Sequence, residues 1–270
     1  MVQETWLTAT GAPKKHLTRG GKPRGGKRRG AGRPPKGERA GAPHTRRPVV
    51  KASTPVHVVL RVAKAVGSLR KRDMYRALRE ATLVVAKHED VRIVHVSIQK
   101  NHVHLIVEAE GKAALAKGMQ AFQVSAAKKI NRRMPLENGR RRRGAVFPDR
   151  YHMEVITSPR QARHALAYVL NNWRKHGEHR DPAVRGVRVD PYSTARLFAG
   201  WRGDVLARAA PPGFEPLVVW PARSWFLTAG WRQHGLIDAF ELPSATTARA
   251  RIDRATRARL RMVDALRELE

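Results

Sequence analysis

The sequence predicts an α+β domain in which an antiparallel sheet is covered by helices on one face. Three observations support this class. Short β-branched segments show the two-residue alternation of strands, and longer segments show apolar residues at helical spacing. The two kinds of segment alternate between residues 54 and 177, where the apolar material for a core is concentrated.

The first half of this region predicts three strands and one helix. Residues 56–62 are short and β-branched, as a strand should be, and residues 72–88 carry apolar side chains at helical spacing. Residues 91–98 alternate as a strand, a turn follows at 99–101, and residues 102–108 form the next predicted strand. The two adjacent strands joined by a short turn indicate a hairpin.

The second half predicts a helix, a strand and a further helix. Residues 112–133 have helical spacing, and residues 146–157 are expected to form a strand. Ser158 is a good N-cap, and Pro159 suits the first helical position, so a helix is expected over 159–176. The resulting order β-α-β-β-α-β-α is typical of a ferredoxin-like fold.

Composition favours a nucleic-acid partner. The chain has 270 residues and a formal net charge of +32, which attracts polyanions. No stretch approaches the roughly 18 apolar residues of a membrane span, and no apolar leader opens the chain, so no membrane role is expected. The absence of cysteine excludes disulfides, thiolate metal sites and a cysteine nucleophile. A cytoplasmic, nucleoid-associated protein is expected.

The composition divides the chain into three parts. Residues 1–52 are rich in Gly, Pro, Lys and Arg, and we expect a disordered basic arm that follows DNA phosphates or only aids solubility. Residues 53–180 form the central domain, and residues 181–270 form a partly helical C-terminal extension with a last helix from about residue 244. The tryptophans of the extension could stack on unpaired bases or fill a small core.

Two histidines suggest a metal site. His102 and His104 alternate along a predicted strand and so project from one face, whereas Val103 and Leu105 project from the other. Two neighbouring imidazoles on a strand can bind a divalent metal. The alternative is a pair of histidines that only face solvent.

The last predicted helix carries a polar face. Tyr168 and Asn172 lie four residues apart and therefore share a face, with His164 and His176 one turn beyond on either side. This face could serve a site, or it could be an ordinary exposed surface with a partly buried tyrosine.

Taken together, the segments NHVHLIV, FPDRYHMEV and HALAYVLNNWRKH resemble the HUH single-tyrosine transposases, the IS200/IS605-like group, and within it the REP-associated tyrosine transposases. The resemblance covers about residues 54–177. It implies that Tyr168 attacks single-stranded or hairpin DNA to form a covalent 5′-phosphotyrosine, and that His102, His104 and Asn172 bind Mg²⁺ or Mn²⁺. It also implies a monomer or homodimer.

Basic clusters are expected to contact DNA phosphates. They are Arg140, Arg141, Arg142 and Arg143 in a loop and Lys128, Lys129, Arg132 and Arg133 on a helix. Tyr151 is the rival nucleophile. Two other functions are compatible with the charge: a catalytically silent DNA-binding protein, and an RNA-binding protein, although the predicted strands lack the aromatic residues of common RNA-binding sheets.

Overall fold

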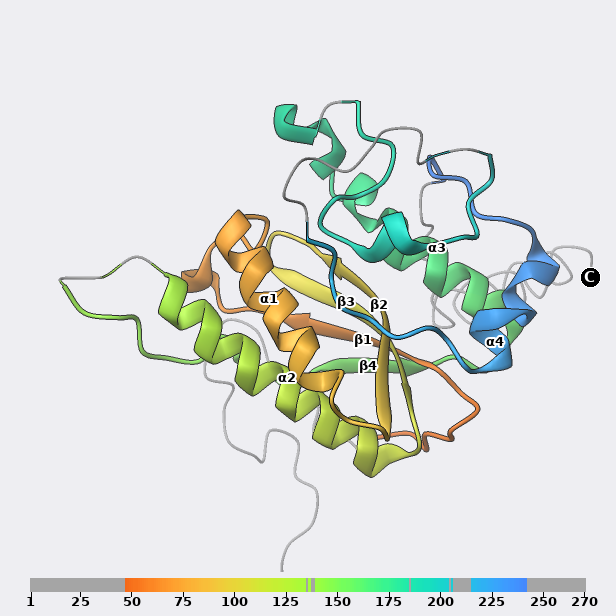
Figure 1. Cartoon of the computed structure of the whole chain (residues 1–270), viewed down its shortest axis with the longest axis horizontal. Helices are drawn as coiled ribbons and strands as arrows, with labels where there is room; N and C mark the ends of the chain where they lie inside the picture. Colours follow the sequence, from red (N-terminus) through yellow and green to blue (C-terminus); the bar gives the residue numbers. More distant parts are fainter. Residues whose placement is uncertain are drawn as a thin grey trace, which may run out of the picture. The chain divides into compact units, whose positions relative to one another are not determined.

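The computed structural model describes residues 47–134, 136, 139–184, 186–203, 205 and 215–241. Its centre is a four-stranded sheet in the order β2-β3-β1-β4, with antiparallel pairing throughout (Figure 1). The strands are β1 (Val56–Arg61), β2 (Val91–Ile98), β3 (His102–Ala109) and β4 (His152–Val155). This order and the antiparallel pairing confirm the α+β, ferredoxin-like class.

One face of the sheet is covered by α1 (Arg72–Val85) and α2 (Lys112–Arg133). Their buried side chains form one core with Val58, Val103 and other strand residues of that face. The backbone of α2 comes close to β2 at Gly118, where a Cβ would lie 2.6 Å from Cγ1 of Val91. A glycine at this position therefore permits the close packing of α2 on the sheet.

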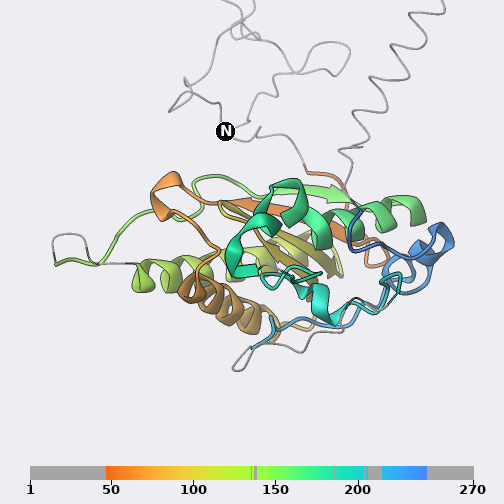
Figure 2. The ribbon, with the colours of Figure 1, turned by 90° about the horizontal axis from the view of Figure 1, so that it is seen from above.

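The third helix, α3 (Pro159–Lys175), lies on the opposite face of the sheet (Figure 2). Its apolar side packs on Val94 and Ile106, which point away from α1 and α2. The expectation that helices cover one face therefore holds for α1 and α2 and needs correction for α3. The physical reason is that the second face also carries apolar residues, and these need a covering element.

A bulge in β2 builds part of that second face. The pairing with β3 passes from Ile93 opposite Val107 to His95 opposite Ile106, so that Val94 is an extra residue. Ile93 belongs to the core under α1 and α2, whereas Val94 belongs to the core under α3. The extra residue, Val94, thus adds an apolar side chain to the face under α3.

The described part of the C-terminal region packs on α3 and β2. This region contains α4 (Trp225–Thr228). The described chain also has five short 3-10 helices: η1 (Lys64–Val66), η2 (Glu178–Arg180), η3 (Pro182–Val184), η4 (Thr194–Leu197) and η5 (Gly230–His234). Trp201 and Trp231 are buried in the same core as α3, whereas Trp220 and Trp225 are partly exposed. The core role proposed for tryptophans of this region therefore applies to the first pair.

Two expected features lie outside the described residues: the basic arm up to residue 46 and the helix from about residue 244. The first described residues already contact the domain, because Val50 is buried and Lys51 forms a bridge with Gly111. No helix in the described part of the chain is long and apolar enough to cross a membrane.

Candidate DNA-cleavage site

β3 carries the first two residues of the site. His102 and His104 project from the α3 side of the sheet, while Val103 and Leu105 are buried under α1 and α2. His104 is buried and His102 is half-buried, and their ring centroids lie 4.7 Å apart. The alternation predicted from the sequence is therefore present, and the two imidazoles are neighbours.

α3 brings Tyr168 to these histidines. The helix begins after Ser158, whose side chain accepts a hydrogen bond from the backbone N–H of Gln161 at 3.2 Å, as the N-cap prediction required. The Tyr168 ring lies 5.3 Å from the His104 ring, centroid to centroid. The predicted nucleophile and the predicted metal ligands therefore share one site.

Asn172 lies on α3 between Tyr168, which contacts His104, and His176, which contacts His102. It is one turn beyond Tyr168 and one turn before His176, the C-cap of α3, whose ring lies 5.2 Å from that of His102. Because residues four apart share a helix face, Asn172 points toward the same side of the sheet as its two neighbours. Its side chain is fully buried. His164, one turn before Tyr168, is exposed instead.

A third histidine, His57 of β1, completes the cluster. Its Nε2 lies 3.0 Å from Nδ1 of His104, and the two rings are stacked with centroids 5.2 Å apart. Its ring also meets the edge of Tyr168 at 5.7 Å. His57 was not predicted from the sequence, because only the β1–β3 register brings it diagonally beside His104. The strand alternation in the sequence already places His57 on the face opposite Val56 and Val58, and this was the one feature that could have pointed to it.

Burial keeps these imidazoles neutral. It lowers the pKa of His102 to about 4 and that of His57 to about 4, with neighbouring positive groups adding to the effect. Burial also places the pKa of His104 well below its ordinary value, and His57, His102, His176 and Lys175 lower it further. A neutral imidazole has a free lone pair, which is the form that binds a metal.

Several buried polar atoms at the site have no hydrogen-bond partner among the described residues. They are Nε2 of His104 and both the oxygen and the nitrogen of the Asn172 amide. Buried polar atoms are normally paired, so unpaired ones need an explanation. No group of three or more His, Cys, Asp or Glu in the described part of the chain could hold a metal ion. Two histidines and the Asn172 oxygen form a donor set that fits a divalent metal with open positions.

A buried ionic cluster ties the β2–β3 turn to the end of α3. Arg70 lies 3.1 Å from the Glu178 carboxylate and 3.0 Å from that of Asp190. Glu178, just after α3, also accepts a hydrogen bond from the backbone N–H of Lys100 at 3.0 Å. The turn that precedes His102 is therefore fixed to the segment that follows His176.

The predicted DNA-binding residues separate into two groups. Arg140, Arg141 and Arg143 are exposed, and Arg142 bonds to Asn131 and to backbone oxygens of its own loop. This loop leads to Val146, whose carbonyl accepts from Ala63 just beyond the sheet end that carries His102. The helix residues lie elsewhere: Lys128, Lys129 and Arg132 border a groove on the outer side of α1 and α2, and Lys129 and Arg133 pair with Glu80.

Two other candidates have different surroundings. Tyr151 is half-buried, and the guanidinium of Arg47 lies 3.5 Å from its ring centroid. Glu108, near the end of β3, is buried; its carboxylate accepts from the backbone N–H groups of Arg223 and Ser224 and from Arg92. Glu108 therefore ties β3 to the segment that leads into α4.

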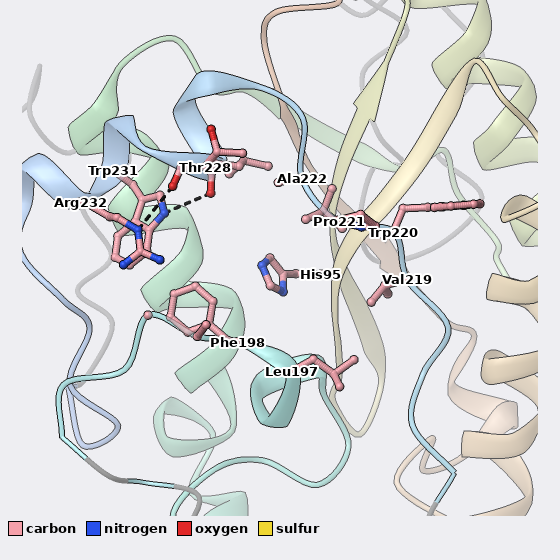
Figure 3. A pocket seen from close by; sticks show the side chains of 14 residues that line it. His95, Leu197, Phe198, Val219, Trp220, Pro221, Ala222, Thr228, Trp231 and Arg232 are labelled. Atoms are coloured by element: carbon pink, nitrogen blue, oxygen red, sulfur yellow. Dashed lines mark hydrogen bonds between the residues drawn. The ribbon is translucent and has the colours of Figure 1, made fainter.

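A separate pocket of about 470 Å³ lies between β2 and the C-terminal region (Figure 3). Phe198, Trp220, Trp231 and Arg232 border it, and the His95 side chain points into it. His95 also bonds to Thr194 at 3.1 Å, and burial lowers its pKa to about 4. None of the predicted site residues lines this pocket.

The fold and site thus define an α+β domain with a helix-borne tyrosine facing a histidine pair on a central strand. Residues 51–172 match the family described as "Transposase IS200 like". The matched segment includes Tyr168 and Asn172, and over this part of the chain the protein is similar to IS200-like transposases.

Solved structures that resemble the chain include a REP-associated tyrosine transposase bound to a REP hairpin. That structure has 20% sequence identity and a TM-score of 0.44, and the similarity covers 66% of this chain and 99% of that chain. No curated protein matches this chain.

Proposed function

We propose that this domain cleaves and rejoins single-stranded or hairpin DNA through a covalent 5′-phosphotyrosine at Tyr168. One observation carries the proposal: Tyr168 lies beside His104, where the His104 Nε2 atom and the Asn172 amide are buried without partners among the described residues. The family match of residues 51–172 supports transposase chemistry at this position.

In the proposed step, the Tyr168 oxygen attacks the phosphorus of a phosphodiester. A bond from the tyrosine oxygen to phosphorus forms, and the bond from phosphorus to the 3′ oxygen breaks. The phenol loses its proton, and the departing 3′ oxygen gains one to become a hydroxyl. Because the phosphotyrosine keeps the phosphoester bond, a 3′-hydroxyl can attack it and restore the DNA strand without ATP.

The charge at this step needs compensation by the protein and its cofactor. His102, His104 and Asn172 would hold a divalent metal, Mg²⁺ or Mn²⁺, which when bound neutralises charge on the phosphate oxygens. Lys175 adds a further positive charge, since its Nζ lies 4.9 Å from the Tyr168 ring centroid. The β1–β3 pairing and the Arg70 cluster keep these groups in register before DNA arrives.

The same proposal places DNA on the α3 side of the sheet. The arginine loop, with Arg140, Arg141 and Arg143 exposed, leads to the sheet end at which His102 begins β3, and we propose that it contacts phosphates there. Lys128, Lys129, Arg132 and Arg133 belong to α2, on the other side of the sheet from Tyr168. DNA bound at Tyr168 would have to pass around the domain to reach them.

The test is covalent capture. Labelled hairpin DNA with single-stranded flanks is incubated with the full chain and Mn²⁺ or Mg²⁺, and the products are separated on a denaturing gel. We expect a slow protein-linked band that disappears with chelator and in Tyr168→Phe. Tyr151→Phe is the matched control, because it removes the same hydroxyl from the rival tyrosine, and it should keep the band.

Each other outcome has a definite meaning. A band that persists in Tyr168→Phe and disappears in Tyr151→Phe would move the nucleophile to Tyr151. No band from any hairpin in a broad pool, with binding retained in a mobility-shift assay, would replace the proposal with a DNA-binding protein that does not cleave.

A further inference from the structure

In each histidine of the β3 pair, the Nδ1 atom forms a hydrogen bond with a neighbouring side chain. Nδ1 of His104 lies 3.0 Å from Nε2 of His57, and Nδ1 of His102 lies 2.7 Å from Oδ1 of Asn101. The two Nε2 atoms are then the ones left for a ligand. For His104 this is explicit, since its Nε2 is buried and has no partner among the described residues.

The hydrogen bonds restrict which nitrogen carries the proton. An amide oxygen only accepts, so Nδ1 of His102 must be the donor toward Asn101, and its Nε2 keeps the lone pair. The His57–His104 bond needs one protonated and one bare nitrogen. If His57 donated, the proton of neutral His104 would sit on Nε2 as a buried donor with no acceptor. If His104 donates, its Nε2 presents a lone pair instead.

We propose that His57 is a positioning residue that accepts the Nδ1–H of His104 and so directs the His104 Nε2 lone pair into the site. The inference rests on the proposed function, because it assigns His104 Nε2 as a ligand atom. Asn101 accepts the Nδ1–H of His102 in the same way. Histidines that bind metals typically donate their other N–H to a fixed acceptor, and this acceptor sets the ring orientation.

The position of His57 suits this role. The β1–β3 register pairs His57 with Ile106, so His104 is its diagonal neighbour on the same face. The two rings are inclined by 22° and stacked. Because both rings are attached to paired strands of one sheet, neither can turn away without breaking this stack. The Tyr168 ring closes the other side of His57.

The proposal is tested on the full chain without any cleavage step. Imidazole ¹⁵N NMR of the metal-free protein should show His104 protonated at Nδ1, with its resonances assigned by their loss in His104→Gln. Calorimetry with Mn²⁺ should show that His57→Leu weakens binding about 10- to 100-fold. His57→Gln offers an amide oxygen as acceptor and should bind Mn²⁺ within a few-fold of the unchanged protein.

His95→Leu is the matched control, since His95 is a half-buried histidine on the same sheet face that bonds to Thr194 instead. It should leave Mn²⁺ affinity unchanged. The inference is overturned if His104 is protonated at Nε2, or if folded His57→Leu binds Mn²⁺ as tightly as the unchanged protein. If His57→Leu does not fold, two other results would overturn the inference. One is protonation of His104 at Nε2 in the NMR spectrum, and the other is a large loss of Mn²⁺ affinity in His57→Gln. Failure of the proposed function would appear separately, as an absent covalent band.

Discussion

At the scale of single residues, two adjacent asparagines of α3 differ in whether the amide nitrogen is paired. Both Asn171 and Asn172 are fully buried. The Asn171 amide nitrogen donates to the backbone carbonyl of Asp238 at 2.8 Å, whereas neither polar atom of Asn172 has a partner among the described residues. Asn171 therefore holds the C-terminal region in place, and Asn172 makes no equivalent hydrogen bond within the described part of the chain.

We therefore predict opposite effects of the same substitution on stability. Asn172→Leu removes an unpaired buried amide and should raise the free energy of unfolding by about 1–3 kcal/mol, while it abolishes Mn²⁺ binding. Asn171→Leu loses a hydrogen bond and should lower stability by about 1 kcal/mol with Mn²⁺ binding intact. Urea unfolding and calorimetry measure the two quantities. A loss of stability in Asn172→Leu would show that its amide has a structural partner.

Single residues also show which contacts of the candidate site could be predicted from the sequence and which could not. His102 and His104 could be placed on one face because a strand alternates, and Tyr168 and Asn172 because a helix repeats about every four residues. His57 could not be assigned, since its contact with His104 depends on strand register, which a single sequence does not specify. The contacts of Glu108 could not be predicted for a similar reason, because its partners Arg223 and Ser224 lie more than a hundred residues away.

At the scale of elements, the long helices and the hairpin agree with their predicted bounds, and β4 is the exception. The strand was expected within residues 146–157, but only His152–Val155 pair with β1. Pro148 has no N–H to contribute to a ladder, and the Val146 carbonyl is used by Ala63 in a loop contact. The strand is therefore shorter than the sequence analysis predicts.

The start of α3 gives a prediction at this scale. Ser158 and Ser224 both occupy N-cap positions, but only the Ser158 side chain accepts a backbone hydrogen bond. Ser158→Ala should therefore lower the free energy of unfolding by about 1 kcal/mol, and Ser158→Asp should restore it. Ser224→Ala, the matched control, should cost little, because its buried hydroxyl oxygen has no partner among the described residues. Equal losses in the two alanine variants in urea unfolding would contradict the assignment.

At the scale of the whole molecule, charge and architecture act together. The formal net charge of +32 attracts DNA to any part of the surface, but the site lies only on the α3 side of the sheet. Composition could predict the class of partner but not the side on which it binds. That choice depends on α3 covering the face opposite α1 and α2, which the sequence pattern did not reveal.

The salt dependence of hairpin binding separates the two basic clusters. Replacing Arg140, Arg141 and Arg143 by Gln should reduce the slope of log K against log salt by about 2–3, since each lost phosphate contact contributes about 0.7–0.9. Replacing Lys128 and Arg132 by Gln removes two exposed charges from α2 and should leave the slope nearly unchanged. Fluorescence anisotropy across a salt series measures both. A larger change from the α2 pair would place DNA on the other side of the sheet.

The burial of α3 on two sides has a consequence for the number of DNA ends that one chain can hold. The helix packs on the sheet through Leu166 and Leu170 and is covered by Trp231 and Leu227 of the C-terminal region. Tyr168 thus lies beside His104 of its own chain, and under the proposed function one tyrosine would carry one phosphoryl group at a time. Joining two different ends would therefore require either two successive rounds at the same tyrosine or two chains, each holding one end.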